Sequence, residues 1–365
     1  MNILFYYPDK ERSISLSSLM IAFQKQGHTV HLLTHSTEGD LHQNVRKAGV
    51  VTHTYPIPKN NSIIFFFKHI LFLISFTKKN NIAIVYSHIQ VANFISCISQ
   101  YFTPSRFILC RHHSDCAYID NNFNEKLLDK IINRLGKEFI VPSQKVYDQM
   151  VITEGVKNKK IYLIRYAYDF SQYAKPVNES VNAIKEEFKC KLLLIKTARL
   201  ISEKRHIMLF KVMNQLAKKG LDIKLMVLSD GPERKNLEEY IANNNLQNNI
   251  FMLGYRRDVI NYIAAADVVV HVSMSEASNS LVKEAGLLEK PVIACSNVGD
   301  FDEYLSNNKN GIIIPKENFE NKLTKTLEQI YSGNYNISSL GNDLKKTILD
   351  LFSIESIIAK YNQFI

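Results

Sequence analysis

Short apolar segments alternate with longer segments of helical periodicity along most of the chain. The runs at Asn2–Tyr7, Thr29–Thr34 and Arg106–Cys110 have the length of strands that are buried on both faces. Between the first two, residues 13–26 repeat their apolar positions at helical spacing, and Gly27 ends that segment. This alternation predicts repeated βαβ units with parallel sheets, which is an α/β fold.

The same pattern continues through the first half of the chain. Further strands are expected at 51–55, 82–86, 138–141 and 161–164, with helices at 62–79, 90–102, 123–135 and 143–150. The period is lost over residues 166–180, which contain Pro176, and this segment predicts a linker between two domains.

The second half repeats the plan, and the remainder of the chain is mostly helical. Strands are expected at 191–196, 223–228, 250–253, 267–272, 291–295 and 311–314, with helices at 205–218, 232–244, 256–265 and 280–289. We therefore predict two Rossmann-like, doubly wound domains over 1–170 and 171–345, and a helix at 346–365 that packs back on the first domain. Ligands of such sheets bind at the carboxyl ends of the strands, so a site in a cleft between the domains is expected.

Two glutamates, Glu276 and Glu284, frame the start of the helix expected at 280–289. Either Ser278 or Asn279 would be its N-cap, and the unpaired backbone N–H groups there would form an anion site. Glu284 would lie one to two turns into the helix, where a carboxylate can accept hydrogen bonds from both hydroxyls of a ribose. By themselves, two acids at this spacing are equally typical of a solvated helix.

In its setting, however, this segment resembles the signature of glycosyltransferase family 4, a family of retaining enzymes with the GT-B fold. In that family a Glu, seven residues and a Glu-Ala pair precede a Pro-Val-Ile-Ala strand, which a Gly and a Glu follow. The matching positions here are Glu276, Glu284-Ala285, Pro291–Ala294, Gly299 and Glu303.

Other motifs follow in the order of the same family. Arg199-Leu200 and Glu203-Lys204 resemble its Gly-Arg-Leu and Glu-Lys element, with Ala198 in place of the Gly. Two cations at a strand end would stabilise a departing nucleoside diphosphate. The resemblance therefore implies catalytic roles for Arg199, Lys204 and Glu276, of which Glu276 would orient the donor sugar. It also implies a donor-binding set of Ser278, Asn279, Ser280, Leu281, Glu284, Gly231 and Tyr255.

The first domain resembles the family more loosely. Its strand end at 111–115 matches the segment that carries an active-site His, and His112 aligns best, with His113 as the alternative. His88 matches another strand-end His that would lie on the acceptor or donor-sugar side. The Gly-Gly loop that the family has after its first strand is missing, because residues 8–15 read PDKERSIS.

The resemblance implies transfer of a sugar from a nucleoside-diphosphate sugar, linked to UDP or GDP, to a hydroxyl of a saccharide or lipid-linked acceptor. Synthesis of cell-surface polysaccharide or lipopolysaccharide is the expected setting. The missing Gly-Gly loop favours one alternative, an inactive nucleotide-sugar-binding or scaffold protein. A nucleotide-sugar epimerase of the same fold is a further alternative, although it lacks the paired-glutamate block in this form.

Composition adds expectations about cofactors and partners. The 365 residues carry a net charge of +10, of which +8 falls in residues 1–170, where 20 Lys and Arg face 12 Asp and Glu. Such a basic half can meet an anionic membrane or be an ordinary solubilising surface, whereas no aromatic-interleaved basic motif favours nucleic acid. No metal cofactor is expected: the five cysteines form no CxxC pair, and the Asp300-Phe301-Asp302 triplet lies where the family has a turn.

The apolar segment 63–76 contains Lys68 and His69 and is too short to span a bilayer. It is either a buried helix or an interfacial helix with Lys59, Lys68, Lys78 and Lys79 near lipid headgroups. No leader pattern begins the chain, so we expect a cytoplasmic protein, with peripheral contact to the cytoplasmic face of the inner membrane as an open possibility.

Overall fold

The computed structural model describes residues 1–58, 62–115, 118, 122–157 and 159–365. Two compact units divide the chain: the first comprises Met1–Tyr173 with Leu351–Ile365, and the second comprises Ala174–Asp350. The sequence placed the corresponding boundaries at 170 and 345. Lys59 and Cys116 lie outside the described residues, and the other four cysteines have free thiols.

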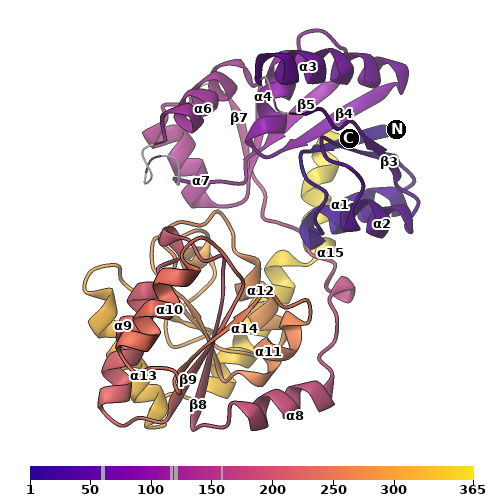
Figure 1. Cartoon of the computed structure of the whole chain (residues 1–365). Coiled ribbons are helices and arrows are strands. Elements are labelled where there is room, and N and C mark those ends of the chain that lie inside the picture. Colours follow the sequence, from indigo (N-terminus) through magenta and orange to yellow (C-terminus); the bar gives the residue numbers. More distant parts are fainter. Residues whose placement is uncertain (59–61, 116–117, 119–121, 158) are drawn as a thin grey trace. The chain divides into compact units, whose positions relative to one another are not determined.

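The first unit is built on a seven-stranded parallel sheet (Figure 1) in the order β3-β2-β1-β4-β5-β6-β7. Its strands are β1 (Asn2–Tyr7), β2 (Thr29–Thr34), β3 (Val51–Thr54), β4 (Ile82–His88), β5 (Arg106–Cys110), β6 (Glu138–Val141) and β7 (Lys160–Leu163). Its helices in the described residues are α1 (Ile14–Lys25), α2 (Asp40–Arg46), α3 (Ser62–Lys79), α4 (Gln90–Ser99), α6 (Phe123–Leu135), α7 (Gln144–Asp148) and the π-helical turn η1 (Gln149–Thr153).

Apolar side chains cover both faces of this sheet. On one face α1 and α2 pack with α15 (Ile354–Tyr361), whose Ile357 and Tyr361 are buried in that core. On the other face α3 and α4 pack through Phe65, Leu73 and Ile95. The last helix of the chain is therefore part of the first unit.

The second unit has a six-stranded parallel sheet in the order β10-β9-β8-β11-β12-β13. Its strands are β8 (Leu192–Thr197), β9 (Ile223–Leu228), β10 (Ile250–Gly254), β11 (Val268–His271), β12 (Val292–Cys295) and β13 (Ile312–Ile314). Its helices are α8 (Asn178–Glu187), α9 (His206–Lys218), α10 (Arg234–Asn243), α11 (Val259–Ala265), α12 (Ser280–Leu287), α13 (Phe319–Tyr331) and α14 (Ile337–Phe352), whose last two residues belong to the first unit.

The helix expected at 346–365 is divided at Ser353 between the end of α14 and α15, and two helices were not expected. Residues 40–46 form α2 where no helix was expected, and α8 begins at Asn178, within the expected linker. Both helices are short, with seven and ten residues, so hydrophobic periodicity carries little information there.

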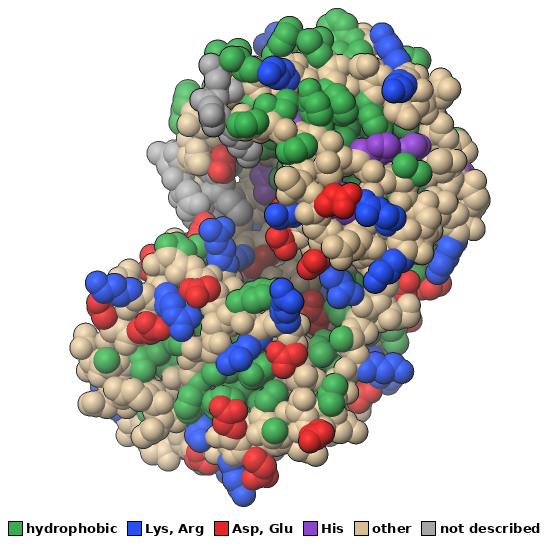
Figure 2. Space-filling model, turned by 45° about the vertical axis from the view of Figure 1, so that its right-hand side comes forward, with side chains coloured by type: hydrophobic (Ala, Val, Ile, Leu, Met, Phe, Trp, Pro, Cys, Tyr) green, Lys and Arg blue, Asp and Glu red, His purple; other side chains and the backbone are tan. Residues whose placement is uncertain are grey.

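Helix α3 has a buried face and an exposed apolar face. Phe65, His69 and Leu73 are buried, whereas Ile63 and Phe67 are 81% and 61% exposed, and Leu71 is exposed one turn further on. Figure 2 shows hydrophobic side chains gathered over the upper part of the first unit, where Figure 1 draws α3. No described helix is both long and apolar enough to cross a bilayer.

Candidate functional site

The carboxyl ends of β8 and β11 bring together the loops that carry the predicted donor residues. The loop after β11 donates a backbone hydrogen bond from Met274 N to Glu203 O, at 2.8 Å, which fixes it to the loop after β8. Lys204 Nζ lies 2.6 Å from Glu276 Oε1, in an ion pair whose side chains are 19% and 12% exposed. Two residues separated by 72 positions in the sequence thus form one polar centre.

Glu276 has a second partner that the sequence did not indicate. His271, the last residue of β11, is fully buried, and its Nε2 lies 3.3 Å from Glu276 Oε1. Burial by itself raises the pKa of Glu276, but His271 and Lys204 more than offset this and hold that pKa well below its usual range. The carboxylate is therefore ionised and oriented from two sides.

The loop before α12 is ordered by its own side chains. Asn279, not Ser278, is the N-cap, and its Oδ1 accepts a hydrogen bond from Leu281 N at 2.9 Å. Ser278 instead donates to Asp300 Oδ2. The N-terminal amides of α12 and the positive end of its dipole are thus presented beside Glu276.

A buried ion pair stabilises this loop. Lys283 Nζ lies 2.7 Å from Asp300 Oδ2, both side chains are fully buried, and the ammonium also donates to Ser278 Oγ at 2.9 Å. Asp302 Oδ2 accepts from the backbone N–H of Asn297 at 2.6 Å. The two acids of the Asp-Phe-Asp triplet are therefore directed to a lysine and to the backbone, and no group of metal-binding residues occurs in the described part of the chain.

The other predicted donor residues lie around these loops. Gly231 follows β9 in the sequence and packs against the backbone of Leu200. A Cβ atom at position 231 would lie 2.5 Å from the Leu200 carbonyl oxygen. Arg199 is exposed in the loop after β8, and Tyr255 is 75% exposed after β10. Glu284 is half-buried in the first turns of α12, and this partial burial raises its pKa to about 7, although Ser280 partly offsets the shift.

The histidines of the first unit form a hydrogen-bonded chain. His88 Nδ1 lies 2.8 Å from His112 Nε2, and His112 Nδ1 lies 2.6 Å from the hydroxyl of Tyr166. Burial lowers the pKa of His112 to about 4, with a smaller contribution from His113, so both linked rings are neutral at pH 7. His113 is directed to Asp129, at 2.9 Å. His88 and His112, each expected at a strand end, thus lie together, and neither this contact nor the Tyr166 partner was indicated by the sequence.

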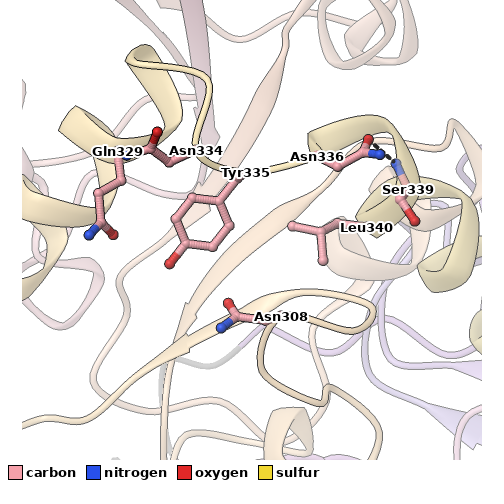
Figure 3. A pocket seen from close by; sticks show the side chains of 7 residues that line it. All are labelled: Asn308, Gln329, Asn334, Tyr335, Asn336, Ser339 and Leu340. Atoms are coloured by element: carbon pink, nitrogen blue, oxygen red, sulfur yellow. Dashed lines mark hydrogen bonds between the residues drawn. The ribbon is translucent and has the colours of Figure 1, made fainter.

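A separate hollow lies at the ends of α13 and α14 (Figure 3). Amide and hydroxyl side chains line it together with Tyr335 and Leu340. Asn336 there caps α14 by accepting from Ser339 N at 3.1 Å. None of the predicted site residues lines this hollow.

The fold and the strand-end loops of the second unit define the class of the protein, a glycosyltransferase-type GT-B architecture of two Rossmann-like domains. Solved structures support this class. The complex of Anabaena Alr3699/HepE with UDP has a TM-score of 0.80 at 18% identity and covers 100% of this chain and 99% of its own. Sucrose-phosphate synthase from Thermosynechococcus elongatus has a TM-score of 0.80 at 17% identity, with 99% and 97% covered.

Two family models match consecutive parts of the chain. The family described as "Glycosyltransferase Family 4" matches residues 13–172, and "Glycosyl transferases group 1" matches residues 178–346. Together the two models cover most of the chain, which belongs to the glycosyltransferases that they describe.

The curated relatives align with this chain over only part of their own length. The poly(ribitol-phosphate) alpha-N-acetylglucosaminyltransferase of Staphylococcus aureus (strain COL) is 21% identical over 243 residues, which are 66% of this chain and 48% of that protein. The alpha-monoglucosyldiacylglycerol synthase of Acholeplasma laidlawii is 26% identical over 210 residues, 53% and 51% of the two chains. The chain thus spans about half the length of these relatives.

Proposed function

We propose that this protein transfers a sugar, with retention at the anomeric carbon, from a nucleoside-diphosphate sugar to a hydroxyl of a saccharide or lipid-linked acceptor. The observation that carries the proposal is the Lys204–Glu276 centre beside the N-terminus of α12. A cation and the N-terminal end of a helix suit a diphosphate, while an ionised carboxylate suits sugar hydroxyls.

Each polar group has a role in the proposed reaction. The bond from the anomeric carbon to the phosphate oxygen breaks as the bond to the acceptor oxygen forms, and the acceptor proton passes to the departing phosphate. Arg199, Lys204 and the amides of α12 stabilise the charge that develops on that phosphate. Glu276 orients the sugar, and Glu284 accepts from the ribose hydroxyls. The proposal uses no metal ion.

His88 and His112 are proposed to act on the acceptor or donor-sugar side. Both rings are neutral at pH 7, and in the ligand-free protein both ring nitrogens of His112 are hydrogen-bonded, to His88 and to Tyr166. His112 is proposed to exchange its bond to Tyr166 for a neutral hydrogen bond to a sugar hydroxyl, while His88 fixes the plane of the ring.

We further propose peripheral contact with an anionic membrane through the exposed face of α3. This face carries Ile63, Phe67 and Leu71 at four-residue spacing, with Lys68, Lys78 and Lys79 exposed on the same helix. Apolar side chains with lysines beside them fit the boundary between acyl chains and anionic headgroups. One relative is named as an alpha-monoglucosyldiacylglycerol synthase, and the lipid in that name supports the proposal.

A panel of UDP- and GDP-sugars tests the proposal in two steps. A donor at one hundred times its dissociation constant stabilises the folded protein by about 2.7 kcal/mol, which a thermal shift detects. Release of nucleotide from that donor then separates an enzyme from an inactive binding protein, because a binder shows the shift without the release. A protein that no donor in the panel stabilises would contradict the proposal.

A further inference from the structure

Lys196 is a buried cation that the proposed reaction does not use. It lies one residue before the end of β8, in the middle of the sheet, after the apolar residues Leu192–Ile195. Its side chain is 1% exposed, and among the described residues its Nζ has no hydrogen-bond partner. An ammonium in such a place is costly unless a negative charge lies near it.

The charges around Lys196 are those of the donor site. Burial is the largest influence and lowers the pKa of Lys196 to about 7. Glu276 favours the charged ammonium, whereas Lys204 and Arg205 disfavour it. Burial and these neighbouring charges together leave Lys196 close to the balance between its two protonation states at neutral pH.

A bound diphosphate would shift the protonation equilibrium of Lys196 towards the charged ammonium. In the ligand-free protein Glu276 is paired with Lys204 at 2.6 Å. If the diphosphate binds Lys204 as proposed, that ammonium is shared between two anions, and negative charge is added close to a buried amine. Interactions between charges are strong in such a weakly screened place, so the added negative charge stabilises the protonated form of Lys196.

We propose that Lys196 is a positioning residue that takes up a proton when the nucleoside diphosphate binds, and so supplies a buried cation behind Glu276 once Lys204 is shared with the ligand. This inference rests on the proposed function and deepens it. It makes donor affinity dependent on pH through a residue that does not touch the donor.

Other titratable groups around the centre do not take up this proton at pH 8. His206, at the start of α9, has its pKa lowered to about 3 by burial and then by Lys196, and burial also lowers the pKa of His271. Glu284, whose pKa is raised to about 7, releases a proton if a ribose favours its charged form. The remaining charged groups nearby are Lys204 and Arg205 on the β8 loop and Lys283, Asp300 and Glu303 beside α12, of which Lys283 and Asp300 are paired.

Calorimetric titration of the full chain with UDP, and with GDP as a second probe, measures this uptake. At pH 8.0 the binding heat is compared in buffers of different ionisation enthalpy, which yields the number of protons bound. A group with a pKa near 7 is about 10% protonated at pH 8, so complete protonation adds about 0.9 proton per nucleotide. Lys196→Met should lose this share, while Lys224→Met, which removes a lysine from the adjacent strand β9, should keep it.

Affinity gives a second readout. Between pH 6 and pH 8 the free energy needed to protonate Lys196 rises, so UDP affinity of the wild type should fall about tenfold more than that of Lys196→Met. Lys196→Gln serves as a smaller polar replacement if the Met variant does not fold. Lys196→Arg, which is always charged, should bind UDP without the extra proton.

Two results would overturn the inference. One is UDP binding to the wild type with no proton uptake at pH 8.0, and the other is equal uptake in the wild type and in the Lys196 variants. If neither nucleotide binds the wild type, the proposed function fails and this inference fails with it. Binding without uptake would overturn the role of Lys196 alone.

Discussion

At the scale of single residues, the two glutamates of the donor loop have opposite electrostatic environments. Glu276 is partly buried, yet His271 and Lys204 keep it ionised. Glu284 is half-buried, but it has only Ser280 to offset the cost of burial, and its pKa rises to about 7. One carboxylate is therefore fixed in its charged form, and the other changes protonation near neutral pH.

This difference predicts how stability depends on pH. The pKa of Glu284 rises from 4.5 to about 7 on folding, so the folded state loses stability as pH increases through that interval. A shift of this size corresponds to about 3 kcal/mol above pH 7. Glu284→Gln should remove the loss, which urea unfolding of ligand-free protein at pH 5 and pH 8 measures. An equal pH dependence of unfolding in the variant and the wild type would show that Glu284 is not the cause.

The buried pair Lys283–Asp300 predicts a large effect of a single substitution. Lys283→Met leaves Asp300 charged and without its cation in a fully buried place, which should cost about 3–5 kcal/mol of unfolding free energy. Lys345→Met is the matched control, because it breaks an exposed pair with Glu289 and should cost about 1 kcal/mol or less. Adding Asp300→Leu to Lys283→Met should restore most of the loss, and a double variant no more stable than the single one would contradict this account.

The sequence could predict some of these residues and not others. Lys204 and Glu276 follow expected strands, so their meeting at one sheet edge could be inferred, and the structure places them 2.6 Å apart. His271, Lys196 and Lys283 lie within apolar strand or helix patterns, where a polar residue gives no sign of its partner. Their contacts depend on neighbouring strands and loops that pattern alone does not align.

At the scale of elements, the buried strands were predictable from the sequence. In an α/β fold, a short continuous apolar run flanked by turns is typical of a parallel strand that is buried on both faces. The structure confirms β1, β2 and β5 at the expected residues. Helices α2 and α8 were missed, since segments of seven and ten residues hold too few turns for a helix to be identified from periodicity alone. Bounds shifted by one to three residues at other elements, as with α12, which ends at Leu287 rather than 289, and α4, which ends at Ser99 rather than 102.

Helix α3 carries a prediction about membrane association. Phe67→Ser combined with Leu71→Ser removes two exposed apolar side chains, and burying each one in lipid is worth about 1.5–3 kcal/mol. Cosedimentation with vesicles rich in phosphatidylglycerol should therefore weaken by roughly tenfold or more. Ile152→Ser removes an apolar side chain that is 76% exposed elsewhere in the same unit and should leave binding unchanged. Undiminished binding of the double variant would exclude this face of α3.

At the scale of the whole molecule, two units with the same Rossmann-like topology have different roles in the proposed reaction. The second unit holds the donor residues, and the first holds the histidine chain and the exposed face of α3. The chain returns to the first unit at its end, where Tyr168 N donates to Phe352 O at 2.8 Å and α15 fills one core. A sequence pattern can show two such units, but it does not show which core a final helix completes.

The central claim is that the Lys204–Glu276 centre of the second unit turns over a nucleotide sugar. Its most direct test is the rate of nucleotide release from the donor identified by the panel, in the wild type, in Lys204→Ala and in Arg199→Ala combined with Lys204→Ala. Removing one group that stabilises developing charge typically lowers kcat by about 10²–10³, and the double variant should lose more. Lys235→Ala, an exposed lysine of α10, is the control and should retain the wild-type rate. Wild-type turnover by the double variant would contradict the account.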